Sequence, residues 1–283
     1  MGYGDSLQMF DRVQAGLEGW CNAPEAGFKI PMHELTALRQ RVVASGKTFQ
    51  ALFDRHASII TPLKKWTTIE QALTPDGQTI SLVEHDGSYA IRVGAAELMS
   101  TRQHASEEKM AELACAHIRT ARAPRVLIGG LGFGFTLKAA LAVLGPGATV
   151  VVAELLAAVI AWNSDAALPL AAPAMADARV TVLRRDVAAV IAESRGGFDS
   201  IILDVDNGPH ALTTAGNGRL YDFQGLRHVR TALLPGGCAA FWSAAPDAAF
   251  AQLMTRSGFA VAVRRARARA NAGGWHTLFL GHA

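Results

Sequence analysis

The sequence predicts an α/β protein whose doubly wound sheet has seven mostly parallel strands, with a small N-terminal β-domain and an N-terminal helical extension before it. From residue 125 onward, short apolar runs alternate with helix-compatible segments, which is typical of a parallel sheet covered on both faces. A glycine-rich turn follows the first of these runs. Earlier in the chain, two alternating segments flank Asp86-Gly87, a dipeptide that favours a β-hairpin.

Length and composition limit the classes of function. The 283 residues suffice for one large domain with a smaller companion, and 50% of them are hydrophobic. The formal charge of +3 favours neither nucleic acid nor an anionic membrane as a partner. Lys138 and Glu154 interrupt the most apolar region, so no membrane-spanning segment is expected. The three cysteines follow no metal-ligand spacing, which predicts reduced thiols and no metal site.

The chain divides into three predicted regions: a helical extension over 1–66, a small antiparallel β-domain over 67–105 and a nucleotide-binding catalytic domain over 106–283. The extension is compatible with a lid, a cap or a dimerisation arm, and a homodimer is expected. The first helix of the large domain is predicted to run from an N-cap at Ser106 to Ile118. The N-terminus lacks the basic and apolar blocks of a secretory signal, which predicts a cytoplasmic protein.

Seven strands are predicted in the large domain: Val126–Ile128, Thr149–Ala153, Val180–Leu183, Phe198–Leu203, Cys238–Trp242, Ala260–Val263 and Thr277–Leu280. A helix over Phe135–Val143 follows the glycine turn and ends before Gly145-Pro146-Gly147. The last two strands form an antiparallel hairpin at the edge of the sheet. The arginine-rich run 264–269 is predicted to lie in the loop of that hairpin, as a solvated segment and not a nucleic-acid site.

The glycine turn indicates the type of nucleotide. Gly130, Gly132 and Gly134 follow a buried strand and let the backbone approach a ligand closely. A dinucleotide fingerprint would have a third glycine at position 135, where this chain has Phe135. The resulting G-x-G-x-G pattern, with Leu131 inside it, suits a ligand that contains adenosine without a pyrophosphate, as in the S-adenosylmethionine-binding fold of class I methyltransferases.

Acidic residues stand at the carboxyl ends of the predicted strands, where open α/β sheets bind their ligands. Glu154 follows the second strand and is placed to accept hydrogen bonds from both ribose hydroxyls. Asp186, next to Val187, follows the third strand and has two interpretations: it caps a helix, or it contacts an adenine amino group. Asp204 and Asp206 follow the fourth strand in a turn that should face the pocket.

The chain resembles the spermidine synthase (polyamine aminopropyltransferase) family over roughly residues 70–282. The motifs that carry the resemblance are Ile201-Ile202-Leu203-Asp204-Val205-Asp206-Asn207-Gly208-Pro209, Leu220-Tyr221, Leu234-Pro235-Gly236-Gly237 and His276-Thr277. The resemblance implies a donor that is decarboxylated S-adenosylmethionine, a small-molecule amine as acceptor, methylthioadenosine as product and a place in polyamine biosynthesis. By position, Glu154 would hold the ribose, Asp186 the adenine, and Asp204 would orient or deprotonate the attacking amine.

The chain departs from the family pattern at two places. The family's glycine loop usually carries an aspartate where this chain has Phe133, and that aspartate holds the donor's ammonium group. The family's Asp-Ser-Ser-Asp motif is here Asp204-Val205-Asp206-Asn207. Both changes alter carboxylates that would bind cationic amines.

The candidate cofactor-binding residues are therefore Gly130, Leu131, Gly132, Gly134, Glu154, Asp186, Val187 and Asp204, and the candidate catalytic residues are Asp204, Asp206 and Tyr221. Tyr221 either hydrogen-bonds the acceptor or packs under the active-site loop, and His276 is interpreted as structural. The leading function is aminopropyl transfer to an amine. The alternatives are an enzyme that uses intact S-adenosylmethionine, as a methyltransferase or by displacement within the donor, and a non-catalytic nucleoside-binding scaffold.

Overall fold

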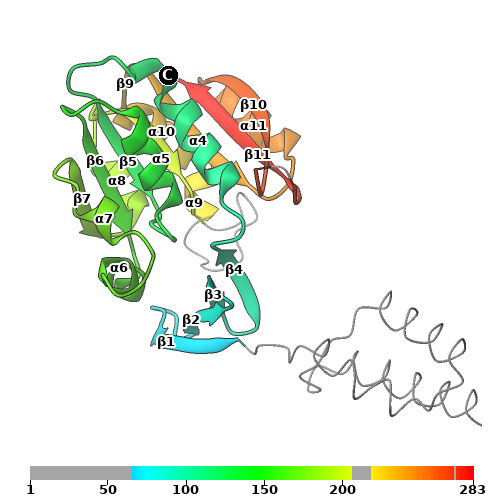
Figure 1. Cartoon of the computed structure of the whole chain (residues 1–283). Helices are drawn as coiled ribbons and strands as arrows, with labels where there is room; N and C mark the ends of the chain where they lie inside the picture. Colours follow the sequence, from blue (N-terminus) through cyan, green and yellow to red (C-terminus); the bar gives the residue numbers. More distant parts are fainter. Residues whose placement is uncertain (1–65, 206–217, 271) are drawn as a thin grey trace, which may run out of the picture. The chain divides into compact units, whose positions relative to one another are not determined.

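The computed structural model describes residues 66–205, 218–270 and 272–283 (Figure 1). The predicted helical extension and Asp206 lie outside these residues. The chain divides after Thr67 into two units, and the second unit, Thr68–Ala283, contains the sheets and helices described below.

A four-stranded sheet opens the described part of the chain. Its strands, in spatial order, are β1 (Thr67–Leu73), β2 (Thr79–His85), β3 (Ser88–Val93) and β4 (Ala96–Ser100). β3 is antiparallel to both β2 and β4. Asp86 and Gly87 both have positive φ, 55° and 74°, as the type I′ hairpin turn requires. The Asp86-Gly87 signal therefore placed the central hairpin correctly.

A seven-stranded sheet forms the centre of the larger domain. Its strands are β5 (Arg125–Gly129), β6 (Thr149–Glu154), β7 (Val180–Arg184), β8 (Phe198–Leu203), β9 (Leu233–Ser243), β10 (Ala260–Arg267) and β11 (Trp275–His282). The spatial order is β10-β11-β9-β8-β5-β6-β7, and β5 to β9 run parallel, whereas β11 is antiparallel to β9 and β10 to β11. All seven predicted strands and the antiparallel edge are confirmed.

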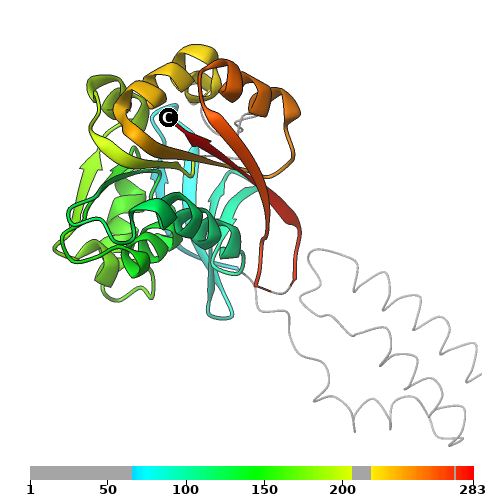
Figure 2. The ribbon, with the colours of Figure 1, turned by 90° about the horizontal axis from the view of Figure 1, so that it is seen from above.

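Helices cover both faces of this sheet, as Figure 2 shows for the green helices on one side and the yellow and orange ones on the other. One face packs against α4 (Ala105–Cys115), α5 (Phe135–Val143) and α6 (Ala157–Ser164), and the other against α8 (Val187–Glu193), α10 (Phe223–Ala232) and α11 (Ala248–Arg256). The short helices are η2 (Ala116–Ile118), α7 (Ala172–Met175) and α9 (Gly218–Tyr221).

The alternation of side chains along each strand explains the two layers. On β5, Val126 and Ile128 point into the core with α4 and α5, whereas Leu127 points into the core with α8 and α10. All three side chains are at most 1% exposed. Because both faces of the strand are buried, its sequence is a continuous apolar run and not an alternating one. The first core also includes Ile80 and Leu82 of the small sheet, so the two sheets share one hydrophobic core.

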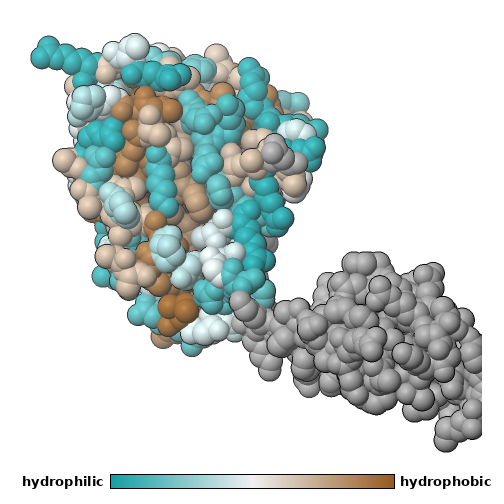
Figure 3. All heavy atoms as spheres, viewed as in Figure 1, coloured by the Kyte–Doolittle hydropathy of each residue, from teal (hydrophilic) through white to brown (hydrophobic). Residues whose placement is uncertain are grey.

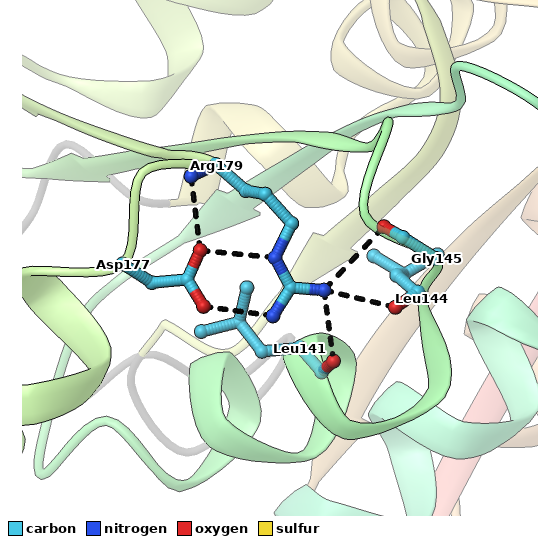
Figure 4. A network of polar contacts seen from close by, with 5 residues as sticks. All are labelled: Leu141, Leu144, Gly145, Asp177 and Arg179. Atoms are coloured by element: carbon cyan, nitrogen blue, oxygen red, sulfur yellow. Dashed lines mark hydrogen bonds and ion pairs between the residues drawn. The ribbon is translucent and has the colours of Figure 1, made fainter.

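Arg179 fixes the carboxyl end of α5 (Figure 4). Its Nη1 donates to the carbonyl oxygens of Leu141, Leu144 and Gly145 at 3.1, 2.8 and 3.4 Å. Its Nε and Nη2 donate to the two carboxylate oxygens of Asp177 at 2.9 and 2.8 Å. The last carbonyls of a helix lack partners within the helix, so a positive side chain there satisfies them and interacts favourably with the helix dipole.

The sequence predicted that the arginine-rich run 264–269 lies in the hairpin loop, and this is wrong for most of the run. β10 extends to Arg267, so Arg264, Arg265 and Arg267 lie on the edge strand of the large sheet. Ala266 is buried and its arginine neighbours are exposed, which is the period of two expected for a strand. The paired β11 holds these residues in extended conformation, and charged side chains on an edge strand disfavour pairing with another chain.

The surface of the described part is mostly hydrophilic in the view of Figure 3, with smaller hydrophobic areas between. Among the described residues, no helix has the length and apolar character needed to cross a membrane.

Candidate active site

The glycine turn lies between β5 and α5, and its conformation requires glycine. Gly130, Gly132 and Gly134 have φ of 82°, 52° and 71°, a region that other residues rarely adopt. A Cβ on Gly130 would lie 2.5 Å from the carbonyl oxygen of Asp204. The first glycine therefore lets the turn pass directly beside the end of β8.

Glu154, at the end of β6, holds the turn in place. Its Oε2 accepts a hydrogen bond from the backbone N–H of Leu131 at 2.9 Å, and its Oε1 accepts one from the N–H of Leu156 at 2.8 Å. The carboxylate is only 8% exposed. Glu154 therefore has a structural role in addition to the ligand-binding role that the sequence predicts.

Asp186 caps α8. Its Oδ1 accepts a hydrogen bond from the N–H of Ala188 at 2.8 Å, and its Oδ2 forms an ion pair with Arg219. The neighbouring Val187 is buried and would clash with a side chain at Gly129. The capping interpretation of Asp186 is thus confirmed, and its contact with an adenine stays a prediction.

Asp204 follows β8 directly and is partly buried. Its Oδ2 accepts a hydrogen bond from the hydroxyl of Thr136, on the first turn of α5, at 2.6 Å. Burial disfavours the charged carboxylate and raises its pKa to about 6, although the hydrogen bond from Thr136 opposes this. A carboxylate with a pKa near neutrality can accept a proton and release it again.

Two cavities meet at Asp204. The first cavity, of about 140 Å³, is lined by the predicted donor-binding residues Gly130, Gly132, Glu154, Asp186, Val187 and Asp204, together with side chains of the small sheet. The second cavity, of about 310 Å³, lies between β4, α4 and the carboxyl end of β9. Leu98, Met99 and Asp204 line both cavities. A ligand in one cavity would therefore be next to a ligand in the other, with Asp204 between them.

Glu107 lines the second cavity and was not singled out in the sequence. Burial, and then the nearby charge of Asp204, raise its pKa to about 8. No ion pair joins Glu107 or Asp204 to a cation among the residues that the structure describes. A signal for this residue was present, because Glu107, Met110, Ala111 and Ala114 have helical i, i+3, i+4, i+7 spacing and lie on the buried face of α4. A glutamate within such an apolar stripe is a candidate for function.

Ser106 joins Glu107 to residues of β9 and β11, and it is not the N-cap that the sequence predicted. The helix begins at Ala105 with His104 in the N-cap position, so Ser106 is its second residue and is fully buried. Its Oγ lies 2.6 Å from Oε2 of Glu107 and 2.8 Å from Nδ1 of His276, and it accepts a hydrogen bond from Nε1 of Trp242 at 3.0 Å. The hydroxyl is thus the centre of a polar network.

Tyr221 and His276 differ in their relation to the cavities. The hydroxyl of Tyr221 donates to the carbonyl oxygen of Val205 at 3.0 Å, and its ring packs against Phe241 and Phe250. Tyr221 lines neither cavity, so this geometry favours packing under the loop, and a catalytic role stays a prediction. His276 lines the second cavity, and its ring lies edge-on to that of Trp242 at 4.6 Å.

The remaining titratable side chains in the described ranges show no grouping typical of a metal site. No cluster of three or more histidine, cysteine, aspartate or glutamate side chains there could hold a metal ion. Cys115 and Cys238 are buried and unbridged, and burial raises the pKa of both thiols to about 12. Such thiols are unreactive at neutral pH.

No protein-family model and no curated protein matches the sequence. The fold, however, matches solved structures. A spermidine synthase in complex with the transition-state analogue AdoDATO aligns with a TM-score of 0.60 at 15% identity, over 77% of this chain and 73% of that one. The spermidine synthase from Thermotoga maritima aligns with a TM-score of 0.61 at 16% identity, over 77% of this chain and 74% of that one. A probable spermidine synthase from Corynebacterium glutamicum aligns with a TM-score of 0.51 at 16% identity, over 78% of this chain and 81% of that one.

The four-stranded sheet, the strand order of the seven-stranded sheet and these alignments agree with one another. The chain therefore has a spermidine synthase-like fold of the class I methyltransferase type, as the sequence predicts.

Proposed function

We propose that this protein is an alkyltransferase that binds S-adenosylmethionine or its decarboxylated form in the first cavity and an amine in the second. The observation that carries the proposal is the position of Asp204, which lines both cavities. A similar spermidine synthase binds the transition-state analogue AdoDATO, which supports a donor of this class. Aminopropyl transfer to a small-molecule amine is the leading reaction.

The residues of the first cavity suit an adenosine group. Glu154 is held by two backbone N–H groups in one orientation and lines this cavity, where a carboxylate is a suitable acceptor for ribose hydroxyls. Gly130 and Gly132 present backbone without side chains along the same wall. The apolar side chains of Leu155 and Val187 offer surfaces for a flat base.

The chemistry assigned to Asp204 follows from the state of an amine near neutral pH. The acceptor arrives as an ammonium and must lose one proton before its nitrogen lone pair can attack. As the new C–N bond forms, the C–S bond of the donor breaks and its electron pair stays on sulfur, which leaves a neutral thioether. Asp204 orients the amine and accepts its proton, and holding the two reactants about 3 Å apart contributes much of the rate.

Phe133 bears on which donor is used. Its side chain is only 3% exposed and packs in the core against Phe135, so it lines neither cavity. A donor ammonium therefore meets no carboxylate at this position, which favours the alternative of intact S-adenosylmethionine in a methyl transfer or a displacement within the donor. Asp204 favours the aminopropyl reaction, because it supplies a carboxylate next to the donor.

Calorimetry with S-adenosylmethionine, its decarboxylated form and methylthioadenosine tests the donor. Turnover of wild type and Asp204→Asn with a set of diamines, with the product identified by mass, tests the reaction. We expect Asp204→Asn to lower turnover by about 10²- to 10⁴-fold and to change donor affinity far less. Binding of none of the three nucleosides would reject the proposal. A methylated product would select the methyltransferase alternative, and equal losses of turnover and affinity would mean that Asp204 holds the donor.

A further inference from the structure

We propose that Glu107, Ser106 and His276 form a proton path along the wall of the second cavity, which carries the proton of the acceptor amine away from Asp204 to the partly exposed His276. The proposal rests on the function proposed above and adds residues to its site. Glu107 lines the cavity beside Asp204, His276 on β11 lines the same cavity and is partly exposed, and Ser106 is fully buried between them. The three side chains are joined by contacts of 2.6 and 2.8 Å.

The reaction needs such a path because one proton is released in each turnover. The acceptor nitrogen enters with three protons and leaves, with its new alkyl group, with two. Asp204 lines both cavities and is partly buried, so in the proposed reaction it has a reactant on either side. A proton that stayed on Asp204 would block the next cycle. Glu107 is the adjacent carboxyl, so it is the next acceptor along the wall of the cavity.

The Ser106 hydroxyl has one proton to donate and two lone pairs, and it has three neighbours. The indole N–H of Trp242 is only a donor, so it occupies one lone pair permanently. When Glu107 is charged, Ser106 donates to it and accepts from Nδ1–H of His276. When Glu107 is protonated, it donates to Ser106, and Ser106 donates to a bare Nδ1. Every hydrogen-bonding group of the network is satisfied in both arrangements.

The two arrangements differ by the movement of a proton. If the Glu107 proton passes to Ser106 while the Ser106 proton passes to Nδ1, then Glu107 becomes a carboxylate and His276 an imidazolium. Nε2 is the other ring nitrogen, and it can release the proton to water. Burial holds the pKa of His276 below its ordinary 6.5, so the imidazolium gives up this proton readily at neutral pH.

The charged groups around this network act on the first step of the path, the transfer to Glu107. They are Asp204 directly after β8, Glu97 on β4, Glu108 on α4 and Lys138 on α5, whereas β9 contributes the neutral Trp242. The carboxylates of Asp204 and Glu108 both raise the pKa of Glu107, which makes it a better acceptor for an amine proton. Lys138 lies near Glu108 and partly offsets its charge.

The test is the tautomer of His276, measured by nitrogen NMR of the ring in the full-length protein without substrates. In wild type we expect Nδ1 to change from bare to protonated as the pH rises through about 8, where Glu107 ionises. In Glu107→Gln the tautomer should not change with pH. Glu112→Gln, an exposed glutamate on the same helix, should behave as wild type. A wild-type tautomer that is constant across this range, or a transition that persists in Glu107→Gln, would overturn the proposal.

A kinetic test follows for the working enzyme. Ser106→Ala interrupts the path and should lower kcat for amine alkylation by about 10- to 10²-fold without changing donor affinity, whereas Ser106→Thr should restore most of it. Unchanged kcat in Ser106→Ala would reject the path. If wild type alkylates no amine but shows the tautomer transition, the proposed function is rejected. The coupling of Glu107 to His276 through Ser106 is then still supported.

Discussion

Replacement of Glu107 by glutamine should stabilise the protein at high pH and not at low pH. The pKa of Glu107 rises from an ordinary 4.5 to about 8 in the fold. At 1.36 kcal/mol for each tenfold change in proton affinity, this corresponds to about 5 kcal/mol of destabilisation once the carboxyl is charged. Because part of the shift comes from the charge of Asp204, which can relax, we expect about 2 to 4 kcal/mol in the measurement.

The direction in which the stability changes with pH follows from proton linkage. Between about pH 4.5 and 8 the folded protein keeps a proton on Glu107 that the unfolded chain releases. The free energy of unfolding of wild type therefore falls as the pH rises through this window. Glutamine resembles the protonated side chain and carries no charge at any pH. The advantage of Glu107→Gln should thus be near zero at pH 5 and reach its full size only above about pH 8.

Urea unfolding of wild type and Glu107→Gln at about pH 5, 7 and 9 measures the difference in the free energy of unfolding. The midpoint concentrations of urea can be compared if the two proteins have the same dependence of this free energy on urea (the m-value). Glu112→Gln is the matched control, because its side chain is 49% exposed on the same helix. That control should stay within about 0.5 kcal/mol of wild type at each pH. The reasoning would be refuted if Glu107→Gln raised the free energy of unfolding equally at pH 5 and pH 9. It would also be refuted if the substitution lowered that free energy at pH 9.

Two further substitutions test the first cavity, and a third tests the ion pair of Asp186, which lines it. Gly130→Ala should destabilise the protein by several kcal/mol and abolish donor binding, because its Cβ would lie 2.5 Å from a backbone oxygen. Gly145→Ala is the control, because a Cβ there would have nothing within 4 Å. If thermal melts show the same loss of stability in both variants, the reason given for Gly130 is wrong. Glu154→Ala should leave the protein folded but weaken methylthioadenosine binding by about 2 to 4 kcal/mol; unchanged affinity in calorimetry would remove Glu154 from the site. Arg219→Ala breaks an ion pair whose arginine side chain is 57% exposed, so the unfolding free energy should change by less than about 1 kcal/mol, and a larger loss would mean that Arg219 has another structural role.

The centre of the large sheet could be predicted from the sequence because strands such as β5 and β8 are buried on both faces. The runs Val126–Ile128 and Ile201–Leu203 are apolar throughout, and each lies within a few residues of a glycine or an acidic residue that marks its end. The strands that were missed are β1 and β4. β1 is largely exposed and carries polar side chains, and β4 has only five residues, so neither has a clear hydrophobic period.

The residues of the first cavity could be found because they lie at the ends of predicted strands. The second cavity could not be found in this way, since its polar network joins residues that are distant in the chain. Ser106 and His276 are 170 positions apart, and their contact depends on how α4 packs against the antiparallel edge of the sheet. The sequence contains the residues of this network but no local pattern that pairs them.

The charge of the second cavity connects its structure with its proposed function. Two carboxyls lie close enough for Asp204 to raise the pKa of Glu107, and both are partly buried. Buried carboxylates are normally paired, because an isolated charge in a poorly solvated place is costly. Within the described ranges no lysine or arginine forms an ion pair with either one, so a cationic ligand is the partner that such a site would stabilise most. An ammonium satisfies this requirement, and after it loses a proton the same two carboxyls can hold that proton until Ser106 passes it on.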